Sequence, residues 1–473
     1  MDQPEKSLNL TDAVMIVSGS MIGSGIFIVA ADMTRVLGSP FWVLICWLLS
    51  GLITLFAALS YGELAGMMPE AGGQFIYIKK AYGKLTAFVY GWTVFTVIQT
   101  GVIAAVAVAF ARFMGVLFPY FDEKNILFQI GTFELSSTKV LAVIAIFFLS
   151  FLNSRGINNG KLIQKVFTST KIIALLGLIV LGLFISGEHS YWSKNMDLSF
   201  HGTNGDTSTT ALLSAIGVAL IGSLFSSDAW NNVTFIAGEI KDPKKNIPLG
   251  LLIGVLLVTI LYILANVAYF ILLPALGSET GIDVIERGVA FAQNDRVGTA
   301  ALNIVLGDLA TVVMAVLIII STFGCNNGLI LSGARLFQAM ANEGLFFKAA
   351  ANTNRFHAPS TSLWIQAIWA SVLCLSGSYG SLLDYCTFAS LVFYIITIST
   401  VFYFRFKMPD APRPYKAFGY PIIPALYIII TLFICIDLLI FKPQNTVWGL
   451  VIMFIGIPVY YLFQLKKDQR IHK

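Results

Sequence analysis

Two short stretches of the sequence place polar and flexible residues in the middle of apolar runs. Residues 18–27, SGSMIGSGIF, hold three glycines and three serines within an apolar stretch that extends from Ala13 to Ala31. A glycine inside a helix costs about 0.5–1 kcal/mol relative to alanine, so we expect an interrupted helix there. A second interruption is expected at Ser226 to Asn232, SSDAWNN. Because unwound backbone in a bilayer is tolerated only where it lines a cavity, the two breaks predict a binding site near the middle of the membrane.

The backbone groups freed at such breaks could hold both ends of a small zwitterion. A half-helix that begins near Gly25 presents unpaired N–H groups and the positive end of its dipole, which suits a carboxylate. Half-helices that end near Met21 and Phe225 present unpaired carbonyls, which suit an ammonium group. Together these groups match the head group shared by all α-amino acids. The alternative for Gly19 and Gly23 is a close helix-packing face of the GxxxG kind.

Lys171 lies about ten residues into a predicted membrane span, deeper than any other basic residue of the sequence. A lysine near the bilayer centre costs about 2.5–3.5 kcal/mol on insertion scales, so it needs a partner. We expect a fixed cation that binds carbonyls of the first span and hydroxyls of the eighth, such as those of Ser321 or Thr322. The alternative is a side chain that snorkels to the membrane surface.

Asp228 is an acid within the second break. One interpretation is a structural carboxylate that accepts hydrogen bonds from the freed N–H groups nearby. A second interpretation places it beside the substrate, where it attracts an ammonium group or a dibasic side chain. A third is a carboxylate that couples transport to protons.

The composition requires an integral membrane protein. Of the 473 residues, 57% are hydrophobic and 12% are charged, whereas a soluble domain carries about 25% charged residues. Hydropathy predicts about twelve membrane-spanning helices. Their ranges are 12–36, 41–67, 83–118, 138–154, 161–186, 209–237, 248–273, 299–340, 362–377, 381–404, 419–440 and 446–464.

We expect one transmembrane domain over residues 1–473, since no long polar linker separates the runs. Its parts are an amino-terminal segment (1–11), a first five-helix repeat (12–186), a second five-helix repeat (209–404), two further helices (419–464) and a tail (465–473). Most of the 30 Lys and Arg residues fall on the side of the amino terminus when the loops alternate sides. This distribution predicts that both termini are cytoplasmic.

Several other classes of function are disfavoured by the sequence. No basic patch with interleaved aromatic residues indicates nucleic-acid binding. None of the five cysteines has CxxC spacing, so we expect buried small residues and neither metal ligands nor disulfides. The spans hold no cluster of nucleophile, base or metal ligands, so we expect neither an enzyme nor a cofactor.

Four stretches resemble signatures of the amino acid–polyamine–organocation superfamily, in particular its L-type amino-acid transporter branch. They are GSMIGSGIF (19–27), YGELAGMMPEAGGQFIYIKKAYG (61–83), DAWNNVTFIAGEIKDPKKNIP (228–248) and STFGCNNGLILSGARLFQAMANEGLF (321–346). The resemblance implies an all-α membrane protein of the LeuT-type fold, a 5+5 inverted repeat of twelve transmembrane helices with helices 1 and 6 broken. It also implies sodium-independent amino-acid transport by alternating access, commonly exchange, with proton-coupled symport as the alternative.

The resemblance also implies roles for residues at the two breaks. The amides of Ser24, Gly25 and Ile26 would hold the substrate carboxylate. The carbonyls of Met21, Phe225 and Asp228 would hold the substrate amine, and the Phe225 ring would act as an aromatic gate. The remaining residues expected to line this site are Ile22, Gly23 and Ser226.

Four residues outside the breaks also match positions of the family. Lys171 matches a lysine of the fifth helix and would stand where sodium sits in sodium-driven relatives. Tyr262 matches a tyrosine on the cytoplasmic side of the pocket, with ordinary core packing as its alternative. Gln99 and Thr100 are candidates for the pocket of the substrate side chain.

The sequence also departs from the family pattern. Asp228 resembles the cystine and dibasic-amino-acid exchanger, so we expect neutral L-amino acids with cationic ones as a further class. Ala229 replaces a glycine before Trp230. No cysteine lies at 119–138, where animal members form a disulfide to a heavy chain, so a stand-alone, bacterial-type protein of the plasma membrane is expected. Residues 277–296 are expected to form either a short amphipathic helix over the outer vestibule or a solvated loop.

Overall fold

Long apolar helices make up most of the computed structural model, which describes residues 6–131, 133–185, 190–195, 199–200, 207–376, 379–441 and 443–471. Within these residues ten helices are long and apolar enough to cross a membrane, and eleven if the bent pair α1 (Leu10–Met21) and α2 (Gly25–Leu37) is one span. The shorter apolar helix α15 (Ser360–Ser376) occupies the ninth predicted run. The chain is an all-α membrane protein that crosses the bilayer many times.

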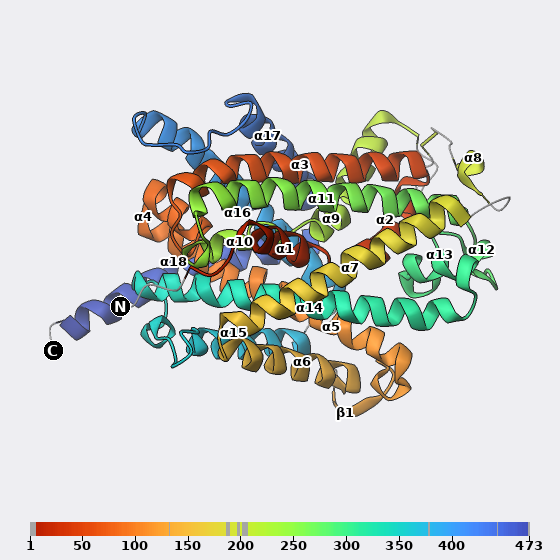
Figure 1. Ribbon diagram of the computed structural model, residues 1–473, viewed down its shortest axis with the longest axis horizontal. Coiled ribbons are helices and arrows are strands. Elements are labelled where there is room, and N and C mark those ends of the chain that lie inside the picture. The colour runs from red at the N-terminus through yellow and green to blue at the C-terminus, as the bar shows by residue number, and fades with distance from the viewer. Residues whose placement is uncertain are drawn as a thin grey trace.

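The helices follow the predicted runs in order. After α1 and α2 come α3 (Pro40–Met67), α4 (Gln74–Thr93) continued by the π-helical turn η1 (Val94–Ile98) and α5 (Gln99–Leu117), α6 (Ser137–Ser154), α7 (Ile157–Ile185), α9 (Thr209–Ser226), α11 (Pro243–Leu272), α14 (Leu309–Asn342), α15, α16 (Tyr379–Lys407), α17 (Ile422–Phe441) and α18 (Pro443–Ile471). Short elements connect them: η2 (Pro119–Phe121), β1 (Ile126–Ile130), β2 (Phe133–Ser136), α8 (Trp192–Asn195), α10 (Asn232–Phe235), η4 (Ala237–Glu239), α12 (Val284–Arg287), η5 (Gln293–Asp295), α13 (Val297–Leu306) and η6 (Lys348–Ala351). The described part of the chain begins and ends at one end of the bundle, at the left of Figure 1. We call this end the terminal face and the opposite end the far face.

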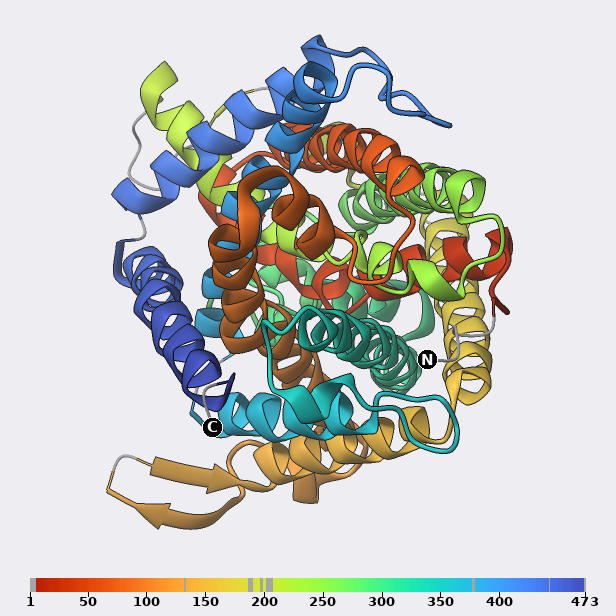
Figure 2. The same ribbon diagram turned by 90° about the vertical axis from the view of Figure 1, so that its left-hand side faces the viewer.

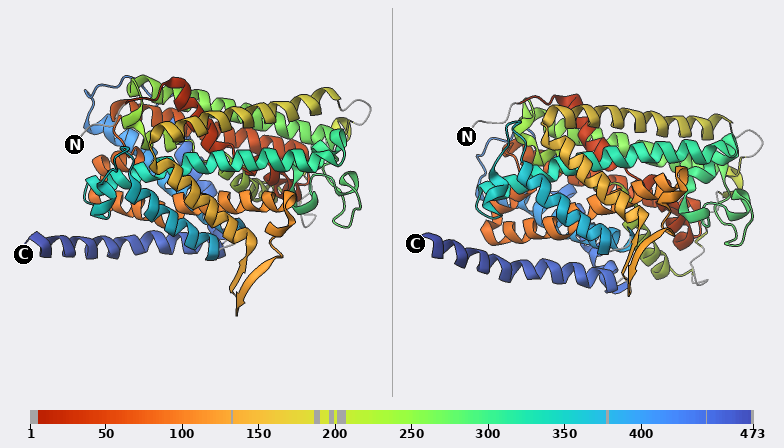
Figure 3. Two further views of the ribbon diagram at one scale, coloured as in Figure 1. Left: turned by 60° about the horizontal axis from the view of Figure 1, so that its bottom comes forward. Right: turned by 90° about the horizontal axis from the view of Figure 1, so that it is seen from below.

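The structure corrects or completes the sequence prediction in three segments. The run predicted at 299–340 is two helices, because Gly307 adopts a φ of +57° between α13 and α14 and only α14 is long enough to span. The loop at 119–138 forms the antiparallel hairpin β1–β2, which projects from the bundle in Figure 3, so the helical fold carries one small exposed sheet. The segment 277–296 holds only the four-residue α12 and the turn η5, so it is mainly a loop.

The broken pair α1 and α2 lies inside the bundle, surrounded by other helices (Figure 2). α1 packs against α7, α11 and α14, while α2 packs against α9. The start of α1 is fixed by a capping box, in which the Asp12 N–H donates to Asn9 Oδ1 (2.9 Å) and the Asn9 N–H donates to Asp12 Oδ2 (3.0 Å). A defined start and a buried position hold the bend between the two helices in place.

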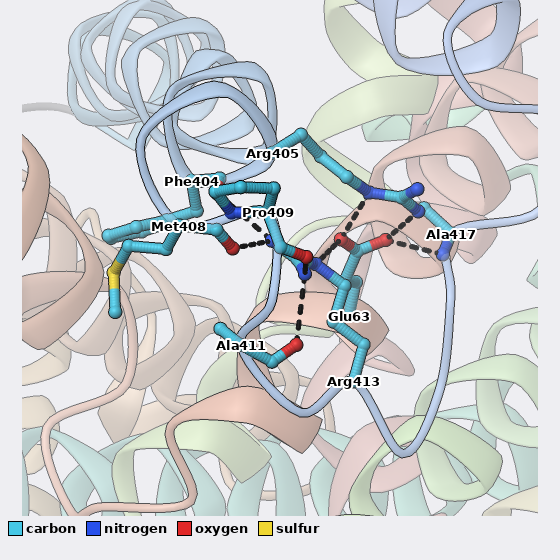
Figure 4. A network of polar contacts seen from close by, with 8 residues as sticks. All are labelled: Glu63, Phe404, Arg405, Met408, Pro409, Ala411, Arg413 and Ala417. Atoms are coloured by element: carbon cyan, nitrogen blue, oxygen red, sulfur yellow. Dashed lines mark hydrogen bonds and ion pairs between the residues drawn. The ribbon is translucent and has the colours of Figure 1, made fainter.

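A buried carboxylate ties α3 to the loop between α16 and α17 (Figure 4). Glu63 is 1% exposed and accepts two hydrogen bonds from Arg405, at 2.8 and 2.7 Å. It also accepts from Arg413 Nε (3.2 Å) and from the Ala417 N–H (2.7 Å). Charge-assisted bonds of this kind are about twice as strong as neutral ones. The cluster therefore fixes α16, which carries Tyr394 into the site described below, against α3.

Candidate functional site

The first break separates two helices that meet at an angle of 43°. α1 ends at Met21 and α2 begins at Gly25. A Cβ atom at Gly25 would clash with Ser226 Oγ, so the backbones of the two predicted breaks lie in direct contact. Gly19 packs equally closely against Gln164 and Thr168 of α7, which fits the helix-packing alternative for that glycine. A Cβ atom at Gly23 would lie 3.6 Å from Cys325 Sγ, an ordinary contact distance.

Side chains from two other helices, α11 and α14, donate to carbonyls at the bend. The Tyr262 hydroxyl donates to Met21 O at 3.1 Å, and the Cys325 thiol donates to Ser20 O at 3.0 Å. The Ser321 hydroxyl donates to the carbonyls of residues 22 and 23, both at 3.1 Å. Since a buried carbonyl without a donor costs free energy, this set of donors stabilises the bent backbone.

The Lys171 ammonium group occupies the centre of this arrangement. Its Nζ atom donates to Gly19 O (2.6 Å), Ile22 O (2.7 Å) and Ser321 O (3.2 Å), and the residue is 1% exposed. These internal contacts contradict the snorkelling alternative. The expected hydroxyl partners differ too: Lys171 contacts the carbonyl of Ser321, and the Thr322 hydroxyl donates to Ile318 O in its own helix at 2.7 Å.

The start of α2 leaves backbone donors without backbone acceptors. Within the described part of the chain, no main-chain carbonyl accepts from the amide N–H of Gly25 or Ile26, the first two residues of the helix. The Ser24 carbonyl accepts from the Phe27 N–H at 3.1 Å. These amides carry the positive end of the α2 dipole, which favours an anionic group at this position.

The second break begins where α9 ends at Ser226 and extends to α10 at Asn232. Ala229 adopts a φ of +65°, a left-handed conformation that glycine takes more easily. Phe225 O accepts from the Asp228 N–H at 3.1 Å, and Ser226 O accepts from the Tyr262 hydroxyl at 3.1 Å. Tyr262 therefore bridges both breaks. Met21 O and Phe225 O, two of the carbonyls expected to hold an amine, accept bonds from Tyr262 and from the Asp228 N–H, and a carbonyl oxygen has two lone pairs.

Asp228 is held by side chains that the sequence analysis did not identify. The Tyr394 hydroxyl donates to Asp228 Oδ1 at 2.5 Å, and the Ser390 hydroxyl donates to Oδ2 at 3.5 Å. Beyond them, Asn231 Nδ2 and the Tyr90 hydroxyl both donate to Gln74 Oε1, at 3.0 and 3.1 Å. Asp228 therefore begins a chain of polar side chains that runs into α4.

A small cavity of about 20 Å³, large enough to hold a water, lies beside this polar chain. Gln99 lines it and donates from Nε2 to Leu329 O at 2.8 Å. Thr100 is not among the lining residues, and its hydroxyl donates to Phe95 O of the π-helical turn at 2.6 Å. Phe225 is half-buried and packs against the apolar cluster of α5, α6 and α14.

A larger cavity of about 760 Å³ lies toward the far face, between α2, α5 and α9. Its wall includes Gly222, four residues before Ser226, and Ile28, three residues after Gly25, so each lies about one helical turn from a break. Its rim is charged and includes Asp32, Arg112 and Arg296. The described conformation thus has a hollow that leads from the far face toward the two breaks.

Ion pairs join the helices at the terminal face. Glu239, at 3% exposure, pairs with Arg335 of α14, and Lys161 Nζ lies 2.7 Å from Asp12 Oδ2. The backbone of Leu8 pairs with the segment that holds Glu239. Burial raises the pKa of Glu239, although the charge of Arg335 opposes that effect. These contacts tie the amino-terminal segment, the second break and α14 together.

The chain matches known transporters over nearly its whole length. The model of a family described as amino acid permease matches residues 8–463. The human cystine/glutamate transporter is 31% identical over 465 residues, 98% of this chain and 86% of that protein. The human b(0,+)-type amino acid transporter 1 is 29% identical over 463 residues, 97% and 88% of the two chains. The human large neutral amino acids transporter small subunit 2 is 29% identical over 462 residues, 97% and 80%.

These matches confirm the resemblance to the amino acid–polyamine–organocation superfamily that the motifs indicated. The third relative is named a small subunit, which gives no support to the expectation that this chain works without a partner chain. The helical architecture and the matches agree on the class of protein. The chain belongs to the amino acid permease family and is a multi-pass membrane transporter of amino acids.

Proposed function

We propose that this chain exchanges L-amino acids across the plasma membrane by alternating access, without a sodium ion. The observation that carries the proposal is the buried Lys171 ammonium group, which lies within 2.7 Å of Gly19 O and Ile22 O at the bend. Unwound backbone carbonyls of this kind coordinate sodium in sodium-driven transporters. A covalently attached cation already occupies these carbonyls here, so a sodium ion is not needed to hold the bend.

The substrate head group fits the two breaks. Its carboxylate would accept from the amides at the start of α2, Ser24, Gly25 and Ile26. Its ammonium group would donate to the second lone pairs of Met21 O and Phe225 O and to the carbonyl at 228. A helix end contributes about 0.3–1 kcal/mol to an ion when exposed and up to about 2 kcal/mol when partly buried. A few such contacts give binding that is specific yet weak enough for release.

The substrate side chain would lie beside Asp228. This carboxylate and the amides of Gln74, Gln99 and Asn231 line the small cavity, which favours polar and cationic side chains beside small neutral ones. We expect Asp228→Asn to lower transport of lysine or arginine relative to alanine when the variants are compared by competition. An unchanged ranking of substrates in the competition assay would show that Asp228 does not recognise the substrate side chain.

Proton-coupled symport is the second candidate function. The observation that favours it is Asp228 itself, an acid in the second break with a 2.5 Å hydrogen bond from Tyr394. In this scheme the carboxylate takes up a proton with each substrate. A symporter needs no amino acid on the other side of the membrane, whereas an exchanger does.

The two candidates are separated by uptake into proteoliposomes that contain only the purified chain. Uptake of a labelled neutral amino acid is measured with and without internal amino acid, with and without sodium, and with an imposed pH gradient. Exchange predicts stimulation by internal amino acid and no effect of sodium. Uptake into empty vesicles that follows the pH gradient would overturn exchange in favour of symport. Activity of the chain alone would also show that transport needs no heavy chain.

A further inference from the structure

A second buried acid lies near the far-face end of an apolar helix, away from the site described above. Asp437 belongs to α17, a span with a mean hydropathy of 2.6, and is 6% exposed. Its Oδ2 atom is buried and has no hydrogen-bond donor among the described residues. A carboxylate in such a place costs several kcal/mol unless it is paired or neutral. Its presence in an otherwise apolar helix therefore calls for a functional explanation.

The carboxyl group of Asp437 lies directly against the backbone of α9. A Cβ atom at Gly217 would clash with Asp437 Oδ2, so this contact exists only because position 217 has no side chain. α9 and α17 pack against each other. α9 is also the helix that ends at Ser226 in the second break. One helix therefore contacts Asp437 at Gly217 and ends at the second break.

No charged side chain faces Asp437 among those that the structure describes. α9 carries no ionisable residue, and the first residues of α18 carry none. Glu63 of α3 is paired with arginines at the terminal face. On α16, Cys386 donates to Val97 O and Tyr394 donates to Asp228. On α17 itself the neighbouring ionisable side chain is the uncharged, buried Cys435. A proton is thus the simplest partner for the carboxylate.

We propose that Asp437 is a proton-binding site whose occupancy controls the position of α9. The neutral acid packs against the backbone at Gly217, as seen here. The ionised acid needs water, so α9 has to move away from α17 before the proton leaves. Asp437 lies four residues before the end of α17 at Phe441, about 6 Å along the helix axis, so protons reach it from the far face.

The inference rests on the proposed exchange activity, because movement of α9 is read out as transport. Exchange is measured in proteoliposomes with the same pH on both sides, so no proton gradient drives uptake. We expect the wild-type rate to rise by about fivefold or more from low to high pH, the size of a typical coupling between two sites. Asp437→Asn is expected to keep the low-pH rate throughout, Asp437→Glu to keep a pH dependence, and the exposed far-face control Asp308→Asn to behave as wild type.

A second readout keeps the inference separate from the transport proposal. The wild-type protein is expected to show the infrared band of a protonated carboxylic acid that disappears in Asp437→Asn. If the wild type and Asp437→Asn exchange with the same pH profile, Asp437 does not control the position of α9. If the two proteins show the same infrared band, Asp437 does not bind the proton. Failure of the wild-type chain to exchange at any pH would refute the proposed function, while the infrared result would still decide the proton site.

Discussion

Replacement of Lys171 by methionine removes the fixed cation with little change in side-chain length. Gly19 O then loses its only described side-chain donor, whereas Ile22 O still accepts from Ser321 Oγ at 3.1 Å. One buried acceptor without a donor lowers the folding stability by about 1–3 kcal/mol, whereas removal of a lysine from the bilayer interior raises it by about 2.5–3.5 kcal/mol. The net change in folding stability should therefore lie between a loss of about 0.5 kcal/mol and a gain of about 2.5 kcal/mol.

Transport by Lys171→Met is expected to fall much further than stability. The two short bonds to the bend are charge-assisted and are worth about 1.5–3 kcal/mol each. If about 2.7 kcal/mol of this total holds the bend in its working geometry, the exchange rate falls about 100-fold. Initial exchange rates are measured for equal amounts of folded protein, and the melting temperature of each variant is measured in detergent. Lys165→Met, on the exposed side of α7, is the control. A wild-type exchange rate in Lys171→Met would refute the role of the cation.

Three further substitutions test the breaks and the terminal face. Gly25→Ala is expected to abolish exchange because the methyl group would clash with the second break, while Gly177→Ala, with open space around it, keeps the activity; equal rates would contradict the contact between the breaks. Ala229→Gly is expected to stabilise the protein by up to about 1 kcal/mol by relieving a φ of +65°, and a lower melting temperature would argue against that strain. Arg335→Ala is expected to destabilise the protein by about 3–5 kcal/mol because its glutamate partner is left buried and unpaired, and an unchanged unfolding curve would disprove a buried pair.

The parts of the fold with local causes were predictable from the sequence. The bend at 22–24 follows from three glycines within seven residues, and the order of the spans follows from hydropathy. Burial of Lys171 was predictable because a lysine within a span needs internal partners. The division of the run 299–340 at Gly307 was missed because both flanking segments are apolar, so hydropathy does not change at the turn.

The parts with long-range causes could not be predicted in the same way. Tyr394 and Asp228 are separated by 166 residues, and no local pattern marks either as the other's partner. Asp437 was missed because one acid barely lowers the hydropathy of a strongly apolar span. Thr322 was expected to face Lys171, but a threonine in a helix readily donates back to its own turn, as it does to Ile318 O. Which partner a side chain contacts depends on the direction in which packing holds it.

The most direct test of the account uses three competitors of one labelled amino acid in the exchange assay. They are the unlabelled amino acid, the amine that lacks its carboxylate, and the carboxylic acid that lacks its amine. Since the amides at Gly25 and the carbonyls of the two breaks are proposed to hold opposite ends of the substrate, each analogue should bind at least about tenfold more weakly, a loss of about 1.4 kcal/mol. Competition by the amine as strong as that by the amino acid would show that the break at Gly25 holds no carboxylate, which would contradict the account.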